Sequence, residues 1–159
     1  RIVKSVMANA ELTFKDTDAH LVVIMPSVVE RLLDHRQLDP LSDEAAGVLI
    51  GERRGPHIVI QRLSEPGKGD IRNRHSVNRL GAHHQIAVDK AFTSSKGTFQ
   101  YLGEWHTHPE DAPSPSQTDT SSWATNLVDI EPMILIIVGR QKIWAAKKIG
   151  RKLVPLTEI

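Results

Sequence analysis

The sequence predicts a mixed α/β or α+β fold, and three observations lead to this prediction. Short segments rich in β-branched residues alternate with two or three amphipathic segments of helical spacing. The run Met133–Val138 is apolar throughout, as expected for a central strand that is buried on both faces. A length of 159 residues suits a single domain, residues 1–159, that buries about two-thirds of the surface of its unfolded chain.

The first half of the chain predicts four strands and one helix. Residues 27–36 are predicted to form an amphipathic helix because their apolar side chains recur on one face. The sequence Arg54-Gly55-Pro56 predicts a turn between two paired strands. The predicted strands cover residues 11–15, 21–25, 46–53 and 57–63.

The segment from Glu65 to Arg79 is rich in Gly, Pro and Arg, so we expect it to be the most mobile loop. Its positive charges have two interpretations. They either belong to a solvated loop, or they form a basic lip that guides an acidic or extended partner.

The second half predicts two helices and four strands. Neighbouring side chains on a helix point about 100° apart, so we interpret His83 and His84 as surface residues that cannot bind one metal together. The predicted helices cover residues 80–94 and 115–127, and the predicted strands cover residues 98–106, 133–138, 143–149 and 152–157. The other histidines without a partner at ligand spacing are His20, His35, His57 and His75.

Composition argues against several classes of protein. The chain has no cysteine, so it has no disulfide framework, and this fits a reducing cytoplasm. Lysine and arginine number 20 against 19 acidic residues, so no strong field favours a nucleic-acid or membrane partner. The longest apolar run, Met133–Val138, is far shorter than the roughly 20 residues that cross a bilayer.

Two histidines lie at the end of the strand predicted over residues 98–106. Residues two apart on a strand share a face, so the imidazoles of His106 and His108 are expected to point the same way. Two neutral imidazole nitrogens on one side are half of a tetrahedral zinc shell. The strand is then stopped by the prolines Pro109, Pro113 and Pro115.

A helix start follows, and it can complete the shell. Ser114 is the expected N-cap, Pro115 the first helical residue and Gln117 the capping-box partner. In that frame Ser116 and Asp119 lie on one face of the first turn. A His, His, Asp set leaves a fourth position for water, which is typical of catalytic zinc. Each motif alone also has a structural interpretation, as a helix cap or as a surface pair.

A general base must come from elsewhere, because neither histidine is free to serve. Glu104 shares a strand face with His106, but we expect its side chain to lie behind the metal. Glu44 is the better candidate, since it leads into an apolar strand that contains Gly47 and Gly51. Either close backbone approach or a bulge accounts for glycines in a strand.

The combined pattern resembles the JAMM, or MPN-plus, zinc metallopeptidases, which include enzymes that remove ubiquitin and ubiquitin-like proteins from their conjugates. The similar organisation runs from about His20 to Lys148. The resemblance implies a curved mixed β-sheet flanked by helices, cytidine-deaminase-like, with zinc at the sheet edge. The motif positions are Glu44, Gly47, Leu49 and Gly51 in Glu-x-x-Gly-x-Leu-x-Gly, and His106, His108, Ser116 and Asp119 in His-x-His, seven residues, Ser-x-x-Asp.

The expected chemistry is hydrolysis of an amide. Zn²⁺ held by His106, His108 and Asp119 would make water reactive near neutral pH. Glu44 would accept the proton of that water and return it to the departing amine. Ser116 would donate a hydrogen bond to the developing oxyanion. No substrate-binding residue is assigned.

The resemblance also implies a substrate class. Single-domain bacterial members of the family include peptidases that reverse ubiquitin-like conjugation in antiphage CBASS operons, where the modified protein is a cyclic-oligonucleotide synthase. The chain is similar to that group in its Gly-x-x-His-Thr-His-Pro arrangement, residues 103–109. The implied partners are a ubiquitin-like modifier or conjugated protein, whose extended C-terminal tail adds to the sheet edge, and its lysine-bearing target. Two alternatives are a hydrolase of ubiquitin-like sulfur-carrier adducts and a non-catalytic MPN scaffold.

Overall fold

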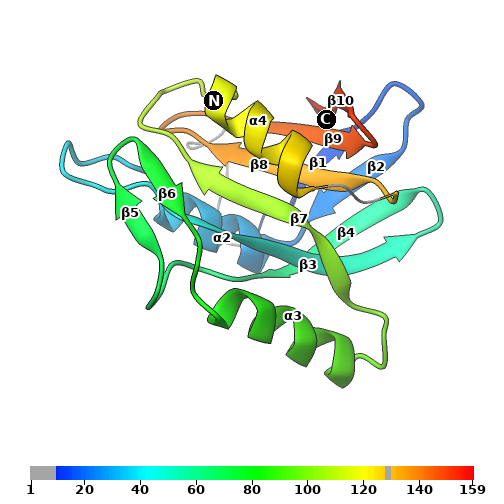
Figure 1. The fold of residues 1–159 in the computed structure, drawn as a ribbon. Helices are drawn as coiled ribbons and strands as arrows, with labels where there is room; N and C mark the ends of the chain where they lie inside the picture. Colours follow the sequence, from blue (N-terminus) through cyan, green and yellow to red (C-terminus); the bar gives the residue numbers. More distant parts are fainter. Residues whose placement is uncertain (1–9, 128–129) are drawn as a thin grey trace.

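Strand β8 (Met133–Val138) is buried along its whole length, as its apolar sequence predicts. In the computed structural model, which describes residues 10–127 and 130–159, it lies within a long curved sheet (Figure 1). The other strands of this sheet are β1 (Leu12–Lys15), β2 (Leu21–Ile24), β3 (Ala46–Arg54), β4 (His57–Leu63), β7 (Gln100–Thr107), β9 (Ile143–Ile149), β10 (Lys152–Pro155) and β11 (Thr157–Glu158).

The sheet is mixed. Its strand order is β10-β9-β8-β7-β3-β4-β2-β1-β11. The pairs β7–β8 and β2–β4 are parallel, whereas the other neighbouring strands run antiparallel. Strand β7, which ends at the two histidines, therefore lies between β3 and β8 in the interior of the sheet.

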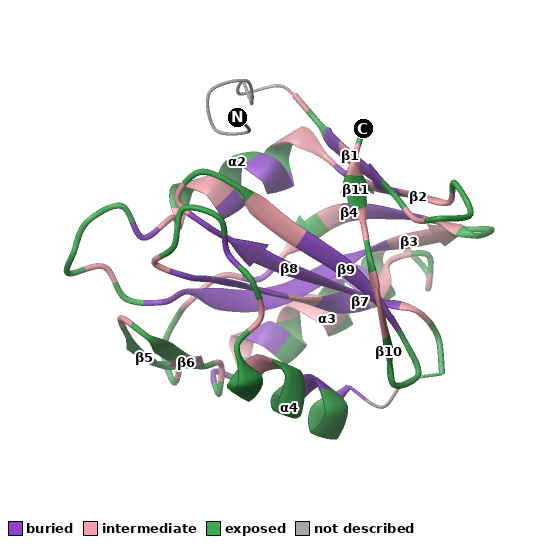
Figure 2. Cartoon of the chain, turned by 90° about the horizontal axis from the view of Figure 1, so that it is seen from above, coloured by how far each residue is buried: buried purple, intermediate pink, exposed green. Residues whose placement is uncertain are grey.

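Helices cover both faces of the sheet. Helix α2 (Pro26–Asp34) packs on one face, and its buried residues belong to the same core cluster as Ile134, Ile136 and Val138 of β8. The alternate β8 residues, Leu135 and Ile137, face α4 (Gln117–Asn126). Helix α3 (His83–Ser94) packs on β3. Figure 2 shows α2 on the side of the sheet opposite α3 and α4. This confirms the mixed α+β prediction, with a curved sheet flanked by helices.

A two-stranded hairpin, β5 (Ile71–Asn73) and β6 (Ser76–Asn78), stands apart from the main sheet. It lies inside the segment 65–79, for which the sequence predicts only a loop. The strands are three residues long and mostly exposed, and they carry no apolar alternation from which a strand could be predicted. Two arginines of this segment donate to backbone carbonyls, Arg72 to that of Glu44 and Arg74 to that of Asp39. The role of the segment as a basic lip stays a prediction.

Close backbone approach explains Gly47, the first glycine of the β3 motif. A Cβ there would lie 1.9 Å from the carbonyl oxygen of Ser64 and 2.6 Å from Nε1 of Trp105. That indole nitrogen donates to the same Ser64 carbonyl. Glycine therefore lets this buried hydrogen bond form directly across β3.

Among the described residues, no helix is both long and apolar enough to cross a membrane. The assignment of residues 1–159 to one domain and the cytidine-deaminase-like arrangement stay predictions.

Candidate functional site

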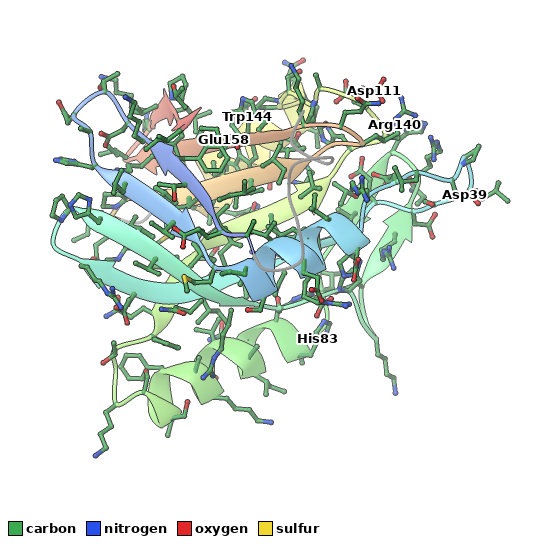
Figure 3. The ribbon with its side chains drawn as sticks, turned by 180° about the vertical axis from the view of Figure 1, so that it is seen from behind. Asp39, His83, Asp111, Arg140, Trp144 and Glu158 are labelled. Atoms are coloured by element: carbon green, nitrogen blue, oxygen red, sulfur yellow. The ribbon has the colours of Figure 1, made fainter. Side chains whose placement is uncertain are left out.

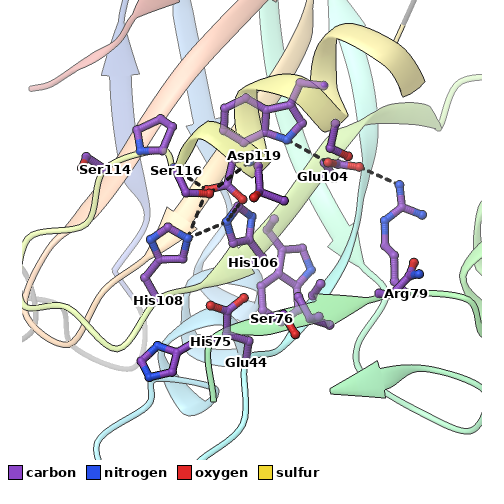
Figure 4. Close-up of a pocket in the computed structure, with 18 of the residues that line it drawn as sticks. Glu44, His75, Ser76, Arg79, Glu104, His106, His108, Ser114, Ser116 and Asp119 are labelled. Atoms are coloured by element: carbon purple, nitrogen blue, oxygen red, sulfur yellow. Dashed lines mark hydrogen bonds and ion pairs between the residues drawn. The ribbon is translucent and has the colours of Figure 1, made fainter. Parts of the chain in front are cut away.

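Two imidazoles and one carboxylate meet where β7 ends. His106 is near the end of β7, and His108 is the first residue after this strand. Asp119 lies in the first turn of α4. The two Nε2 atoms are 3.0 Å apart, and Asp119 places Oδ1 3.2 Å from His106 and Oδ2 3.1 Å from His108. Figure 4 shows the three side chains pointing toward one another. We call these three residues the pocket cluster.

The spacing of the pocket cluster suits a metal ion. Its three ligand atoms all lie within 4.8 Å of one another. Ligand atoms about 2.0–2.1 Å from a tetrahedral zinc ion lie roughly 3.3 Å from each other, so small shifts would admit the ion. Two imidazole nitrogens with one carboxylate oxygen are a donor set that zinc accepts.

The start of α4 fixes the position of Asp119. Ser116 is the N-cap, and its Oγ accepts the backbone N–H of Asp119 while Asp119 accepts the backbone N–H of Ser116. The sequence prediction of Ser114 as N-cap and Gln117 as its partner is therefore wrong. The Ser116–Asp119 pair closes both hydrogen bonds of a capping box, so the helix begins two residues later than predicted.

The loop after β7 orients His108. Its Nδ1 lies 2.8 Å from Oε1 of Glu110, so the ring is held from the side opposite the pocket cluster. The loop itself is tied to the β8–β9 turn, because Arg140 donates to the Asp111 carboxylate and to the Glu110 carbonyl (Figure 3). Sequence analysis gave Glu110 no role. In the sequence, the one feature that indicates this contact is a carboxylate residue, Glu110, two positions after His108.

The cluster perturbs the pKa values of Asp119 and His108. Burial opposes ionisation of Asp119, but its hydrogen bonds with His106 and His108 outweigh burial and hold its pKa far below the usual range. Burial also lowers the pKa of His108, but Asp119 and Glu110 overcome this and raise it to about 8. The cluster therefore favours a cation at its centre, supplied either by a proton or by a metal.

Glu44 lies just before β3 and is 6% exposed. Burial raises the pKa of its carboxyl to about 7; the charge of His108 opposes this rise, whereas Asp119 and Glu110 add to it. In Figure 4 the carboxylate points toward His106 and His108. A carboxyl group with a pKa near neutrality can both accept and return a proton.

These residues line a cavity of about 820 Å³. One wall is the segment from His75 to Arg79, which includes β6, and another is α4. The sequence does not predict this wall, because the hairpin carries no periodic pattern. At the cavity wall Glu104 accepts hydrogen bonds from Arg79 and Trp123, so its carboxylate is engaged with these side chains.

A second cluster of two histidines and one aspartate lies at the start of α3, and we call Asp70, His83 and His84 the clamp cluster. The prediction that both histidines are surface residues is wrong, because His84 is 2% exposed. Its ring lies between the Ser64 hydroxyl and the Asp70 carboxylate. Both histidines lie in the first turn of α3, yet their ring centroids are 3.9 Å apart, so the 100° between neighbouring positions on a helix does not keep the two rings apart.

Known proteins resemble this chain in sequence and in fold. A protein from Vibrio cholerae named CD-NTase/cGAS isopeptidase is 59% identical over 142 residues, covering 89% of this chain and 91% of that protein. A probable metalloprotease from Sinorhizobium fredii is 29% identical over 132 residues, covering 78% and 79%. The solution structure of a Desulfitobacterium hafniense protein is similar in fold, with a TM-score of 0.56 at 22% identity over 86% of this chain and 88% of that one.

The model of the family described as prokaryotic homologs of the JAB domain matches residues 25–149. That range contains Glu44, the pocket cluster and every strand from β3 to β9. Because the match covers most of the chain and the resemblance to JAMM/MPN-plus proteins rests on the same residues, the chain belongs to the family of prokaryotic homologs of the JAB domain.

Proposed function

We propose that this chain is a zinc-dependent isopeptidase that cleaves after the C-terminus of a ubiquitin-like modifier or conjugated protein and releases it from a lysine-bearing target. The observation that carries the proposal is the convergence of two imidazoles and one carboxylate within 4.8 Å, beside a buried glutamate in one cavity. The name of the Vibrio cholerae relative suggests the target, a CD-NTase. This target fits an antiphage CBASS role.

His106, His108 and Asp119 would hold the zinc ion. When bound, zinc would supply Lewis acidity, so that water attacks an amide near neutral pH. The chain supplies the proton transfers. Glu44 would take the proton of the attacking water and deliver it to the lysine amine as the isopeptide bond breaks.

Ser116 would stabilise the oxyanion. Its Oγ accepts the Asp119 N–H with a lone pair, which leaves its own hydroxyl proton to be donated into the cavity. A single donor of this kind contributes roughly 2.7–4 kcal/mol in comparable sites.

The test compares wild type with Glu44→Gln, which keeps the shape of the side chain and removes its basicity. We expect the variant to bind one zinc per chain by elemental analysis. Its turnover of a ubiquitin-like protein joined to a lysine-bearing target should fall by ~10²–10⁴-fold, because proton transfer is lost. Unchanged turnover in Glu44→Gln would remove Glu44 from the mechanism.

The outcome for wild type also separates the alternatives. If wild type binds zinc and hydrolyses only a sulfur-carrier adduct, the substrate class proposed here is wrong. If it binds zinc and hydrolyses neither substrate, the scaffold alternative takes its place.

A further inference from the structure

Gln37, three residues after α2, is a fully buried polar side chain, 0% exposed. Its Nε2 donates to the carbonyls of Ser42 and Arg74 at 3.1 and 2.8 Å, and its Oε1 accepts the hydroxyl of Thr107 at 2.8 Å. One amide therefore joins the segment that leads to Glu44, the β5–β6 turn and the end of β7.

Thr107 connects this amide to the segment that carries Glu44. It lies between the two histidines of the pocket cluster and is fully buried. Its Oγ1 accepts the N–H of Ala45 at 2.9 Å, and its own N–H donates to the Ala45 carbonyl at 2.9 Å. Because successive residues of a strand point to opposite faces, the Thr107 hydroxyl lies on the face away from the imidazole of His106.

The backbone of Glu44 itself is held from the other side. Its N–H donates to the carbonyl of Asn73 at 2.8 Å, and its carbonyl accepts Nε of Arg72 at 2.6 Å. The hairpin β5–β6 and the end of β7 thus hold residues 44 and 45 between them. Gln37 bonds to both of these elements.

We propose that Gln37 and Thr107 are positioning residues, which set the Glu44 carboxylate in register with the two histidines of the pocket cluster. This proposal rests on the proposed function, in which Glu44 transfers protons. The hydroxyl of Thr107 is the link, because it accepts from the residue beside Glu44 and donates to Gln37. Neither side chain touches the reacting atoms.

Thr107→Val removes only the hydroxyl and keeps the branched shape. The N–H of Ala45 and Oε1 of Gln37 would then be buried without their partner, which is unfavourable. Residues 44 and 45 can relieve this cost only by moving. A displacement of ~1 Å at a reacting group can lower the rate ~10²-fold.

The expected result is a fall in kcat of ~10–100-fold with KM and zinc content unchanged, because the imidazoles lie on the other face of β7. Thr107→Ser should restore most of kcat, since it returns the hydroxyl. Gln37→Leu should lower kcat like Thr107→Val, and the double variant should be no worse than either single one. Thr13→Val in β1 is the matched control, separated from β7 by β3, β4 and β2, and it should leave kcat unchanged.

A second readout does not need activity. Amide hydrogen exchange at Ala45 should be at least ~10-fold faster in Thr107→Val than in wild type, with exchange at His106 unchanged. If Thr107→Val loses stability but keeps both kcat and slow exchange at Ala45, the pair is only structural and the proposal is overturned. If wild type cleaves no conjugate, the proposed function fails, while the exchange measurement still decides whether the pair holds residues 44 and 45.

Discussion

The pocket cluster and the clamp cluster have the same composition, two histidines and one aspartate with ligand atoms within 4.8 Å. They differ in what the imidazole nitrogens contact. In the pocket cluster, Nε2 of His106 and Nε2 of His108 face each other and the Asp119 carboxylate. In the clamp cluster, Nε2 of His83 lies 2.6 Å from the carbonyl oxygen of Glu65.

That contact assigns the proton of His83. A carbonyl oxygen only accepts, so Nε2 must carry a hydrogen and cannot at the same time bind a metal. The ring of His84 is occupied at both nitrogens, by the Ser64 hydroxyl and the Asp70 carboxylate. The Asp70 carboxylate in turn accepts the backbone N–H groups of Gly67 and Gly81. A metal site needs convergent lone pairs, so residues of the right types that only lie close together do not form one.

The clamp cluster has a structural role instead. It joins the segment after β4 to the start of α3, and the hairpin that walls the cavity lies between these two segments in the sequence. The glycines make room for it, because a Cβ at Gly67 or Gly81 would lie 2.9 or 2.5 Å from the ring of His83.

The largest effect should come from removing one imidazole of the pocket cluster. We expect His106→Ala to lose bound zinc and to lower turnover by ~10³-fold or more, because metal catalysis supplies several kcal/mol. His83→Ala is the matched change in the clamp cluster and should keep the zinc content of wild type. Elemental analysis of both variants checks this. Two zinc ions per wild-type chain would contradict the statement that only the pocket cluster binds a metal ion.

Asp70→Ala should destabilise the fold without changing the zinc content. It leaves the His84 ring and two backbone N–H groups without their acceptor, so the free energy of unfolding should fall by about 2–4 kcal/mol. Urea denaturation of the zinc-loaded proteins measures this. A variant as stable as wild type would contradict the clamp role.

The two clusters should also respond to pH in opposite directions in the metal-free protein. Burial lowers the pKa of His84, so its contribution to stability is present above the unfolded pKa of about 6.5 and is lost as the pH falls. The pKa of His108 is raised to about 8, so its contribution is present below about 6.5 and is lost as the pH rises through 8.

His108→Gln should therefore destabilise the metal-free protein more at pH 5.5 than at pH 9, by about 2 kcal/mol. His84→Gln should destabilise it more at pH 8 than at pH 5. Denaturation curves at these pH values check both variants, and the same sign for both would contradict the assigned protonation states.

The smallest effect concerns the packing of His83. Gly67→Ala places a methyl group against that ring and should cost about 1–2 kcal/mol of stability. In a His83→Ala background the same change should cost less, because the nearest atoms that the methyl group meets belong to the His83 ring. Equal costs in both backgrounds would show that His83 does not occupy the space beside Gly67.

Local patterns predicted most of the fold. The strands β3, β4, β7, β8 and β9 and the helices α2 and α3 lie close to the predicted ranges because their apolar side chains repeat with the period of a strand or helix. The hairpin β5–β6 and the short strand β11 were missed. They are two or three residues long and polar, and contacts with distant segments hold them in place.

The sequence by itself determined the family and the residues of the pocket cluster, because His-x-His at a strand end and Ser-x-x-Asp at a helix start are short-range geometry. Tertiary structure decided which of two similar clusters keeps its lone pairs convergent, and how Glu44 meets residues that lie far along the chain. The physical reason is that both depend on hydrogen bonds between distant segments, such as those from Thr107 to Gln37 and from Ala45 to Thr107. No local spacing encodes such contacts.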